Sequence, residues 1–396
     1  MTDDLTLITT PAAGGQGTAF TGWTAVRVTR GIERCPSDFE ITATERDPLH
    51  PFTLSIYPGD KCQIMLGSDL ILTGYIDRVI PSMDATSHSV TIQGRSKCED
   101  IVDCSAEFQT FQLANTNPVA LATALCKPFG ITVSTIGDIG TLPIPAFNVT
   151  LTETPFEIIE QIARYAALLA FDGRDGNLIL TRAGSGSMAS GFAQGQNVQS
   201  ATAAFTMDQR YSKYSAILLS NEFLFEAVPA GGAAALVSND SLPAAKDPGV
   251  LRYRPLLFVA EQNDLHYQVA IQRAQWEANR RWGRSQSVKL VCDSWRDQTG
   301  ALWQVNALAN VDLPALKVNN QNWLISLVTF IKDERGTRAE VELMPKEAFL
   351  VEPIILNPYA TGIVEALNQE SGAAGGLQPT GAVQTPAAIP TGGASK

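Results

Sequence analysis

The stretch SVTIQGRSKCEDIVDCSA (residues 89–106) contains two different patterns in direct succession. In its first half, Val90 and Ile92 alternate with polar residues, which is typical of a half-buried antiparallel strand. In its second half the alternation stops, and Cys98 and Cys104 stand among charged residues. This change of pattern predicts that one structural unit ends here and that the next one begins.

The two cysteines could instead belong to a redox centre or a metal site. Zinc usually needs four ligands in compact pairs, but the chain has no CxxC pair and its three histidines are scattered. Free cysteine most often behaves as a small buried hydrophobe, so we expect reduced thiols, with no metal and no cofactor. The residues considered were Cys35, Cys62, Cys98, Cys104, Cys126 and Cys292, with His50, His88 and His266.

Composition limits the classes of protein that the chain can represent. Its 396 residues suffice for two to four domains, and 45% hydrophobic residues can fill substantial cores. The opening MTDDLTLITT lacks the features of a signal peptide, and no run approaches the roughly 18 apolar residues of a membrane span, so we expect no membrane insertion. The net charge of -11 disfavours a nucleic-acid-binding protein, because phosphate binding depends on lysine and arginine.

The residues before this stretch predict a compact β unit. Phe39, Ile41 and Ala43 alternate with polar residues, and Gly67-Ser68-Asp69 predicts a tight turn between two strands. Gly74 would allow the bend that a small barrel needs at its corner. About six strands between residues 23 and 94 suit a barrel or a sandwich.

The residues after the stretch predict a small α+β domain. Asn117-Pro118 indicates a helix that ends before Pro128 and Gly130. Thr154-Pro155-Phe156-Glu157 predicts a capping box, followed by an apolar face through Ile158, Ile162, Tyr165 and Leu169. This helix would pack on a hairpin of residues 168–171 and 178–181.

Strands return near the end of the chain, after a charged helix at residues 265–282. Strands are predicted at residues 286–293, 302–313, 323–332 and 338–344, whereas residues 184–199 and 231–235 read as linkers or loop excursions. The order of strands and turns in this late block is like that of residues 23–94. We therefore expect two related barrels, so that a trimer would present six quasi-equivalent positions.

The sequence contains no motif of a known catalytic site. HExxH, GxxxxGK[ST] and GxSxG are all absent, so we expect no enzyme and assign no catalytic, cofactor-binding or metal-binding residue. DGRDGN (residues 172–177) fits a hairpin turn better than a calcium loop, and Asp100 with Asp103 fits a solvated face better than a glycosidase pair. Trp295 and Trp303 are expected to cap the core of the second barrel, although an aromatic platform for sugars is the alternative.

Three long motifs resemble the baseplate hub proteins of Mu-like contractile-tailed bacteriophages. They are GRSKCEDIVDCSA (residues 94–106), WEANRRWGRS (276–285) and DSWRDQTGALWQVNALANVDLPAL (293–316), the last continued by NNQNWLISLVTFIKDERGTRAEVELMPKEAF (319–349). The wider group of tail hub proteins includes the T4 hub and the N-terminal part of type VI secretion spike proteins. The resemblance covers nearly all of residues 23–349.

The resemblance implies a mainly β fold with α+β insertions: two antiparallel β-barrels of tail-tube type and two small inserted domains. It further implies a homotrimer whose six barrels form a ring in the virion, between the tail tube or its initiator and the central spike, beside other baseplate subunits. The protein would be made in the host cytoplasm, and DNA and the tape-measure protein would pass through the lumen without specific binding. The expected parts are an N-terminal arm (1–18), a first barrel (19–111), an α+β domain (112–199), a second barrel (200–228 and 284–350), an inserted domain (229–283) and a tail (351–396).

In the fold that the resemblance implies, residues 94–106 form the segment at the exit of the first barrel. Arg95 and Lys97 are expected to pair with Glu99, Asp100 and Asp103, and these acidic residues suit the start of a short helix. The tail, rich in Ala, Gly, Pro and Thr, would be either disordered or ordered along a partner such as the spike. Two rival functions stay open, namely a carbohydrate-binding or glycan-degrading β-protein and a hub fused to a cell-wall lytic activity.

Overall fold

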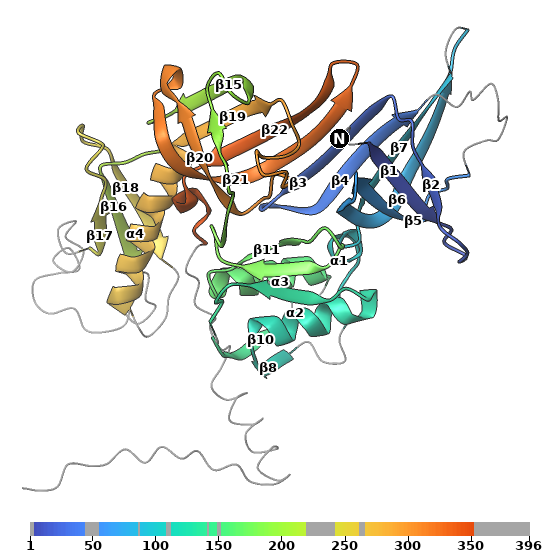
Figure 1. The fold of residues 1–396 in the computed structure, drawn as a ribbon. Coiled ribbons are helices and arrows are strands. Elements are labelled where there is room, and N and C mark those ends of the chain that lie inside the picture. Colours follow the sequence, from blue (N-terminus) through green and yellow to red (C-terminus); the bar gives the residue numbers. More distant parts are fainter. Residues whose placement is uncertain are drawn as a thin grey trace, which may run out of the picture. The chain divides into compact units, whose positions relative to one another are not determined.

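The computed structural model describes residues 4–43, 55–85, 88–107, 112–140, 142–148, 152–218, 242–260 and 266–351. The fold is mainly β, and its largest element is a sheet of 14 strands (Figure 1). In the described part of the chain, no helix is long and apolar enough to cross a membrane. The C-terminal tail and the flexible run expected at residues 231–235 lie outside the described residues.

The first half of the large sheet contains five antiparallel strands in the order β3-β4-β7-β6-β5. Phe39 and Ile41 are buried as their alternation predicts, and Gly67 takes a positive φ of 60° in the predicted turn. A Cβ on Gly74 would lie 1.8 Å from the carbonyl oxygen of Arg95, so only glycine allows this close approach of β6 to β7. The strands are β3 (Ala25–Gly31), β4 (Arg34–Ala43), β5 (Lys61–Leu66), β6 (Asp69–Met83) and β7 (His88–Ser96).

Residues 5–20 add two strands to this half of the sheet, where the sequence predicted a separate N-terminal arm at residues 1–18. Strand β1 (Leu5–Thr10) pairs antiparallel with β5 and carries β2 (Thr18–Phe20) on its other side. Leu5 and Leu7 alternate with polar residues and are 2% and 0% exposed, so their burial fixes β1 on the sheet.

The second half repeats the strand order of the first. Its strands run β15-β19-β22-β21-β20, which matches β3-β4-β7-β6-β5 position by position. The fourth strand of each half even carries a β-bulge at the same place, between Ile76 and Arg78 in β6 and between Ile325 and Leu327 in β21. The strands are β15 (Val198–Phe205), β19 (Gln286–Cys292), β20 (Ala307–Leu313), β21 (Val318–Asp333) and β22 (Gly336–Met344).

One strand pair joins the two halves. The second part of β21 pairs antiparallel with β3, from Leu327 opposite Gly31 to Lys332 opposite Val26. A single hydrophobic core runs through both halves, and it includes Trp295 and Trp303 at 0% and 1% exposure. The expected burial of these two tryptophans in the core is confirmed.

Residues 99–182 form a small unit with three helices. The capping box at Thr154 is present, because Glu157 N donates to Thr154 Oγ1 at 3.2 Å and Thr154 N donates to Glu157 Oε2 at 2.8 Å. The expectation that Leu169 extends the helix face is wrong: the helix ends at Tyr165, and Leu169 begins a strand after Ala167 at φ 54°. The elements are α1 (Glu99–Asp103), β8 (Gln112–Thr116), α2 (Pro118–Cys126), η1 (Lys127–Phe129), β9 (Val133–Ile136), β10 (Ile144–Asn148), α3 (Pro155–Tyr165), β11 (Leu169–Asp172) and β12 (Leu178–Thr181).

A further small sheet carries the long helix. The helix α4 packs on β16, where Tyr214, Ala274 and Ala278 are buried together. It ends at Arg284, beyond the predicted end at residue 282, because Gly283 continues the helix. The remaining elements are β16 (Lys213–Leu218), β17 (Ala244–Lys246), β18 (Pro255–Ala260), α4 (His266–Arg284), η4 (Pro314–Leu316) and η5 (Lys346–Phe349).

The Gly/Ser-rich segment at residues 184–199 is not a free linker. Its short strands β13 (Gly186–Ser187) and β14 (Phe192–Ala193) pair parallel with β20. Phe192 is 1% exposed, and its ring centroid lies 4.2 Å from that of Trp303. The segment therefore covers the outer edge of β20, as β1 covers the edge of β5.

Replacing Phe192 tests this packing. We expect Phe192→Ala to lower the free energy of unfolding by about 3–5 kcal/mol, because a buried aromatic ring leaves a cavity beside Trp303. Phe205→Ala, at a half-exposed position, serves as the control and should cost less than about 1 kcal/mol. Urea denaturation followed by tryptophan fluorescence measures both, and equal effects would contradict the packing role of residues 184–199.

Candidate functional site

Burial keeps several of the cysteine thiols protonated. All six are free, Cys98 is buried and Cys104 is exposed. Burial raises the pKa of Cys126 to about 12 and that of Cys292 to about 11, so neither thiol is activated as a nucleophile. Among the described residues, no group of three or more His, Cys, Asp or Glu side chains is arranged to hold a metal ion.

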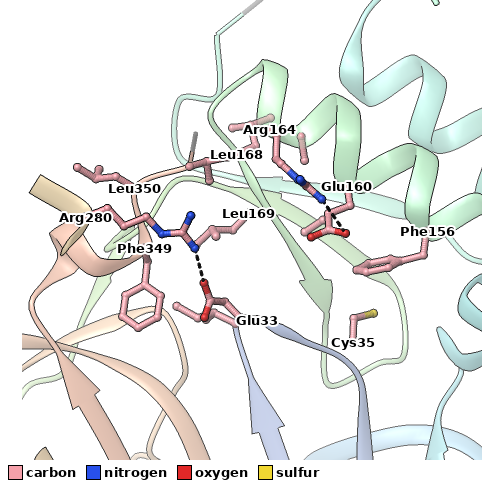
Figure 2. Close-up of a pocket in the computed structure, with 14 residues that line it drawn as sticks. Glu33, Cys35, Phe156, Glu160, Arg164, Leu168, Leu169, Arg280, Phe349 and Leu350 are labelled. Carbon is pink, nitrogen blue, oxygen red and sulfur yellow. Dashed lines mark ion pairs between the residues drawn. The ribbon is translucent and has the colours of Figure 1, made fainter. Parts of the chain in front are cut away.

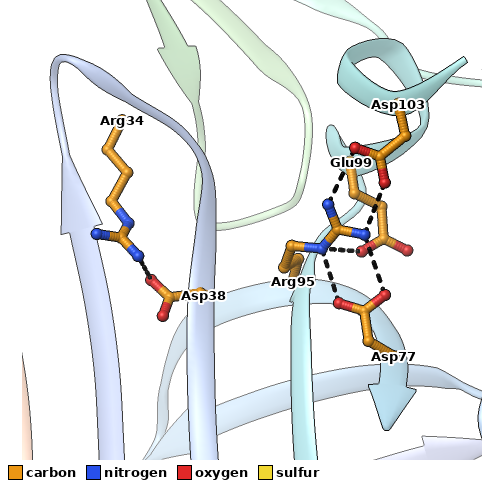
Figure 3. Close-up of polar contacts among 6 residues, drawn as sticks. All are labelled: Arg34, Asp38, Asp77, Arg95, Glu99 and Asp103. Atoms are coloured by element: carbon orange, nitrogen blue, oxygen red, sulfur yellow. Dashed lines mark hydrogen bonds and ion pairs between the residues drawn. The ribbon is translucent and has the colours of Figure 1, made fainter.

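Arg95 organises the joint where β7 passes into α1 (Figure 3). Its Nε donates to Asp77 Oδ2 at 2.7 Å, and its Nη2 donates to Asp103 Oδ2 at 2.8 Å. Glu99 Oε2 lies 3.2 Å from Arg95 Nε, without the geometry of a hydrogen bond. One guanidinium thus holds acids from a strand and a helix, and these hydrogen bonds raise the pKa of Arg95 above its usual value.

The expected pairing of Arg95 with Asp103 is confirmed, and Glu99 lies close to the same guanidinium, but two details differ. Asp77, which stands in the bulge of β6, was not anticipated as a partner. Lys97 donates to the carbonyl oxygen of Gly130 instead of forming an ion pair with the acids of α1. Both differences come from segments distant in sequence, which the local charge pattern does not show.

Glu99 is the acid of this joint whose protonation changes most. Burial raises its pKa to about 8, the negative charge of Asp77 adds to this effect, and Arg95 opposes it. At neutral pH the folded protein therefore holds a proton on Glu99 that the unfolded chain releases. A neutral Glu99 also avoids a third negative charge beside Asp77 and Asp103.

The pH dependence of stability follows from this proton. Because the folded state binds more protons, the contribution of Glu99 to stability falls as the pH rises from about 4.5 to about 8. Glu99→Gln should flatten this fall and make the protein more stable at pH 8 by about 1–2 kcal/mol, a value reduced for solvent screening. Urea titrations at pH 5, 6.5 and 8 measure the free energy of unfolding, with Glu107→Gln as an exposed control. If Glu99→Gln showed the same free energy of unfolding as the unaltered protein at every pH, the prediction would be contradicted.

A second feature clamps the end of the described chain onto α4. Trp276 Nε1 donates to the carbonyl oxygen of Leu350 at 2.8 Å, and the guanidinium carbons of Arg273 and Arg280 lie 5.1 and 5.2 Å from the centroid of the Trp276 ring. Arg284 Nε donates to the carbonyl oxygen of Ala348 at 3.0 Å. Trp276 thus packs outside its own helix, as expected for one of the two tryptophans of α4, while Trp282 stays 38% exposed.

A cavity of about 490 Å³ lies beside this clamp (Figure 2). Its lining comes from the β3–β4 turn, α3, the start of β11, α4 and η5, and it contains both apolar and charged side chains. Two ion pairs stand in its wall, Arg280 with Glu33 at 3.8 Å and Arg164 with Glu160 at 3.3 Å. Val351, the last described residue, also lines this cavity.

Gly283 sets the distance between α4 and η5. A Cβ at this position would lie 2.3 Å from Ala348 N, although alanine favours helices by about 1 kcal/mol over glycine. We expect Gly283→Ala to lower the free energy of unfolding by about 1–3 kcal/mol, because backbone must move to admit the methyl group. Chemical denaturation measures it, with Gly186→Ala as the control because its Cβ would meet nothing closer than 3.8 Å. A stabilised Gly283→Ala variant would show that propensity outweighs the contact.

The tryptophans do not form an exposed platform for sugars. Five of the six are at most 9% exposed, and the indole nitrogens of Trp295 and Trp303 donate to backbone carbonyl oxygens. This arrangement belongs to cores and contacts within the chain, not to a carbohydrate-binding surface.

Comparisons with known proteins agree along most of the chain. Residues 14–96 match the family described as Mu phage baseplate assembly protein GpP-like, N-terminal; residues 98–182 match the second domain of baseplate hub protein gp44-like; and residues 267–352 match the fourth domain of Mu phage baseplate assembly protein GpP. The first two matches meet at Lys97, inside the stretch SVTIQGRSKCEDIVDCSA.

Individual relatives give the same result. The baseplate hub protein gp44 of Escherichia phage Mu is 31% identical over 342 residues, which cover 85% of this chain and 87% of that protein. The crystal structure of the 43 kDa tail protein of prophage MuSo2 from Shewanella oneidensis has a TM-score of 0.76 at 27% identity and covers 89% of this chain and 100% of that one. A type VI secretion component from E. coli, described as structurally similar to the T4 tail proteins gp27 and gp5, shares the fold alone, with a TM-score of 0.51 at 8% identity over 82% of this chain and 73% of that one.

Together, the repeated sheet and these relatives define a structural protein of a phage tail. More closely, the chain belongs to the baseplate hub proteins of Mu-like phages. The names of these relatives describe baseplate and tail components, and they indicate no catalytic activity.

Proposed function

We propose that the chain assembles as a homotrimer whose six sheet halves form a ring, and that this ring joins the sixfold tail tube to the threefold central spike. The observation that carries the proposal is the repetition within the sheet: the two halves share their strand order and the position of a bulge. Three copies of such a chain present six similar units, as a threefold-to-sixfold adaptor requires. In this proposal each half, with its flanking segments, is one barrel of tail-tube type. The insertions, expected at residues 112–199 and 229–283, are the small unit of residues 99–182 and the sheet β16–β18 with α4, while residues 184–199 belong to the second half.

The edges of the sheet support closure of the ring. Within the chain, β3 lies along residues 327–332 of β21. The equivalent edge of β6, residues 78–83, has no partner among the described residues. The outer edge of β15, the strand equivalent to β3, has one bridge there, from Val198 to Gln194, and the rest of that edge, residues 200–205, has no described strand partner. An unpaired strand edge offers a row of donors and acceptors to another chain.

The equivalence of the two halves also fixes a register. Within the chain, Phe330 of β21 lies opposite Val28 of β3. When the two halves are aligned by their bulges and strand pairings, Pro81 of β6 corresponds to Phe330, and Ala203 of β15 corresponds to Val28. Pro81 of one copy would therefore lie opposite Ala203 of the next. Because the two strands would be antiparallel, Ile80, one residue earlier, would lie opposite Ala204, one residue later. Ile80, Met83 and Phe205 are 46%, 82% and 50% exposed, so this pairing would also remove apolar side chains from water.

The proposed partners follow from this position in the tail. The ring would contact the tail tube or its initiator on one side, the central spike on the other, and further baseplate subunits around it, inside the virion. DNA and the tape-measure protein would pass through the lumen, where the net charge of -11 disfavours phosphate binding. An assembled ring whose lumen is lined by lysine and arginine would contradict this part of the proposal.

Cross-linking tests the ring. In a Cys104→Ser background, the double variant Ile80→Cys/Ala204→Cys should form disulfide-linked dimers and trimers on oxidation, because each chain then bonds to the next. Ile80→Cys/Thr202→Cys, displaced by two residues along β15, is the matched control and should cross-link several-fold less. Non-reducing gels and native mass measure both.

Two results would count against the proposal. A trimer that never forms the 80–204 bond would contradict the pairing of β6 with β15. A monomer at every concentration would contradict ring formation by this chain on its own.

A further inference from the structure

A second cavity, of about 190 Å³, lies at the seam between the two halves of the sheet. Its walls come from β3, the β11–β12 hairpin, residues 303–307 and β21, together with the start of β13. Apolar side chains such as Phe171 and Phe330 line much of it. Two arginines, Arg30 and Arg174, also line it, and no catalytic or assembly role described above accounts for them.

Arg30 is buried at the wall of this cavity. It is 8% exposed, and its side chain donates one hydrogen bond within the described residues, from Nη2 to the carbonyl oxygen of Asp172 at 2.7 Å. Its Nε has no hydrogen-bond partner there. Burial lowers the pKa of Arg30, which shows that water does not solvate the charge fully.

Arg174 stands on the turn of the β11–β12 hairpin and is half-buried. It forms no hydrogen bond and no ion pair within 4 Å with any described residue. Burial also lowers the pKa of Arg174, and the positive charge of Arg174 adds to the lowering of the pKa of Arg30. Two cations therefore line one small cavity, and no Asp or Glu is among its described lining residues.

The neighbouring carboxylates have other partners. Asp172 Oδ1 accepts hydrogen bonds from both the backbone nitrogen and the hydroxyl of Ser37, each at 3.0 Å, although Oδ2 has no partner in the described chain. Asp175 accepts from Asn177, and Asp69 pairs with Arg296 at 2.6 Å. Asp172 offsets part of the charge of Arg30, and Asp69 offsets part of the charge of Arg174 although it is itself paired with Arg296.

We propose that this cavity binds a small oxyanion, a phosphate or carboxylate group, between the guanidinium groups of Arg30 and Arg174. A guanidinium fork can donate to two oxygens of a carboxylate or a phosphate, and a mostly apolar wall strengthens the charge-assisted bonds. The hydroxyl of Ser185 is a third donor, because its oxygen accepts from Asn306 Nδ2 at 2.9 Å and its own hydrogen is uncommitted among the described residues. The bound anion would link the seam of the sheet to the hairpin of the small unit.

Binding to the purified full-length protein tests the proposal with two probes, inorganic phosphate and acetate, each against chloride at equal ionic strength. Line broadening of the ³¹P signal of phosphate and of the ¹³C signal of labelled acetate reports binding directly. We expect broadening by at least one probe, and a melting temperature raised by about 2 °C or more at saturation. Arg174→Gln should bind the probe at least tenfold more weakly and should lose the rise in melting temperature. Arg252→Gln, at an exposed position, should keep both the affinity and the rise.

The outcomes separate the sources of the oxyanion. Binding of phosphate alone supports a phosphate ligand, and binding of acetate alone supports a carboxylate, such as an acidic side chain. Binding of neither probe, or equal binding by Arg174→Gln and the unaltered protein, would overturn the proposal. Should Arg174→Gln fail to fold, Arg174→Lys keeps the charge but not the fork, and it should weaken binding several-fold.

Discussion

The antiparallel pairing of β21 with β3 is the constraint on which the rest of this structure depends. It joins two sheet halves that lie at opposite ends of the chain, from Leu327 opposite Gly31 to Lys332 opposite Val26. Because one core runs through both halves, neither half can slip along the other without moving buried side chains to the wrong face. The seam therefore sets a fixed spacing between two similar units, as the proposed adaptor between threefold and sixfold symmetry would need.

The smaller units take their positions from the same seam. Arg30 reaches from β3 to the carbonyl oxygen of Asp172, and Ser37 on β4 donates to the carboxylate of that residue, so the β11–β12 hairpin is bonded to the first half. Asn306 donates to the carbonyl oxygen of Arg182 and so holds the end of the hairpin to the second half. The second cavity lies where these attachments meet, because Arg30 and Asn306 both line it. The first cavity lies instead where α3 and β11 approach α4 and η5.

Local signals in the sequence predicted much of this fold. The capping box at Thr154, the turn at Gly67 and the alternation in β4, β7 and β22 all depend on neighbours within a few residues, and each is present. The pairing of β13 and β14 with β20 was missed. These short strands lie in a segment rich in glycine and serine, which has no apolar alternation, and they are defined by their backbone hydrogen bonds alone. Asp77 in the Arg95 joint and the arginines of the seam were missed for a related reason: their partners are set by a bulge and by tertiary contacts, which periodicity does not contain.

The order in which the ribosome makes the chain gives the seam a further consequence. Strand β3 leaves the ribosome early, but β21, its partner, follows only after about 300 more residues, which takes between about 15 and 60 s at typical rates of synthesis. During that time the edge of β3 is open, and it has the same form as the edge that β15 offers later. A nascent chain therefore carries an unpaired edge on β3 until β21 has been made. Only then can β21 occupy this edge and keep the strand of a neighbouring chain from pairing there.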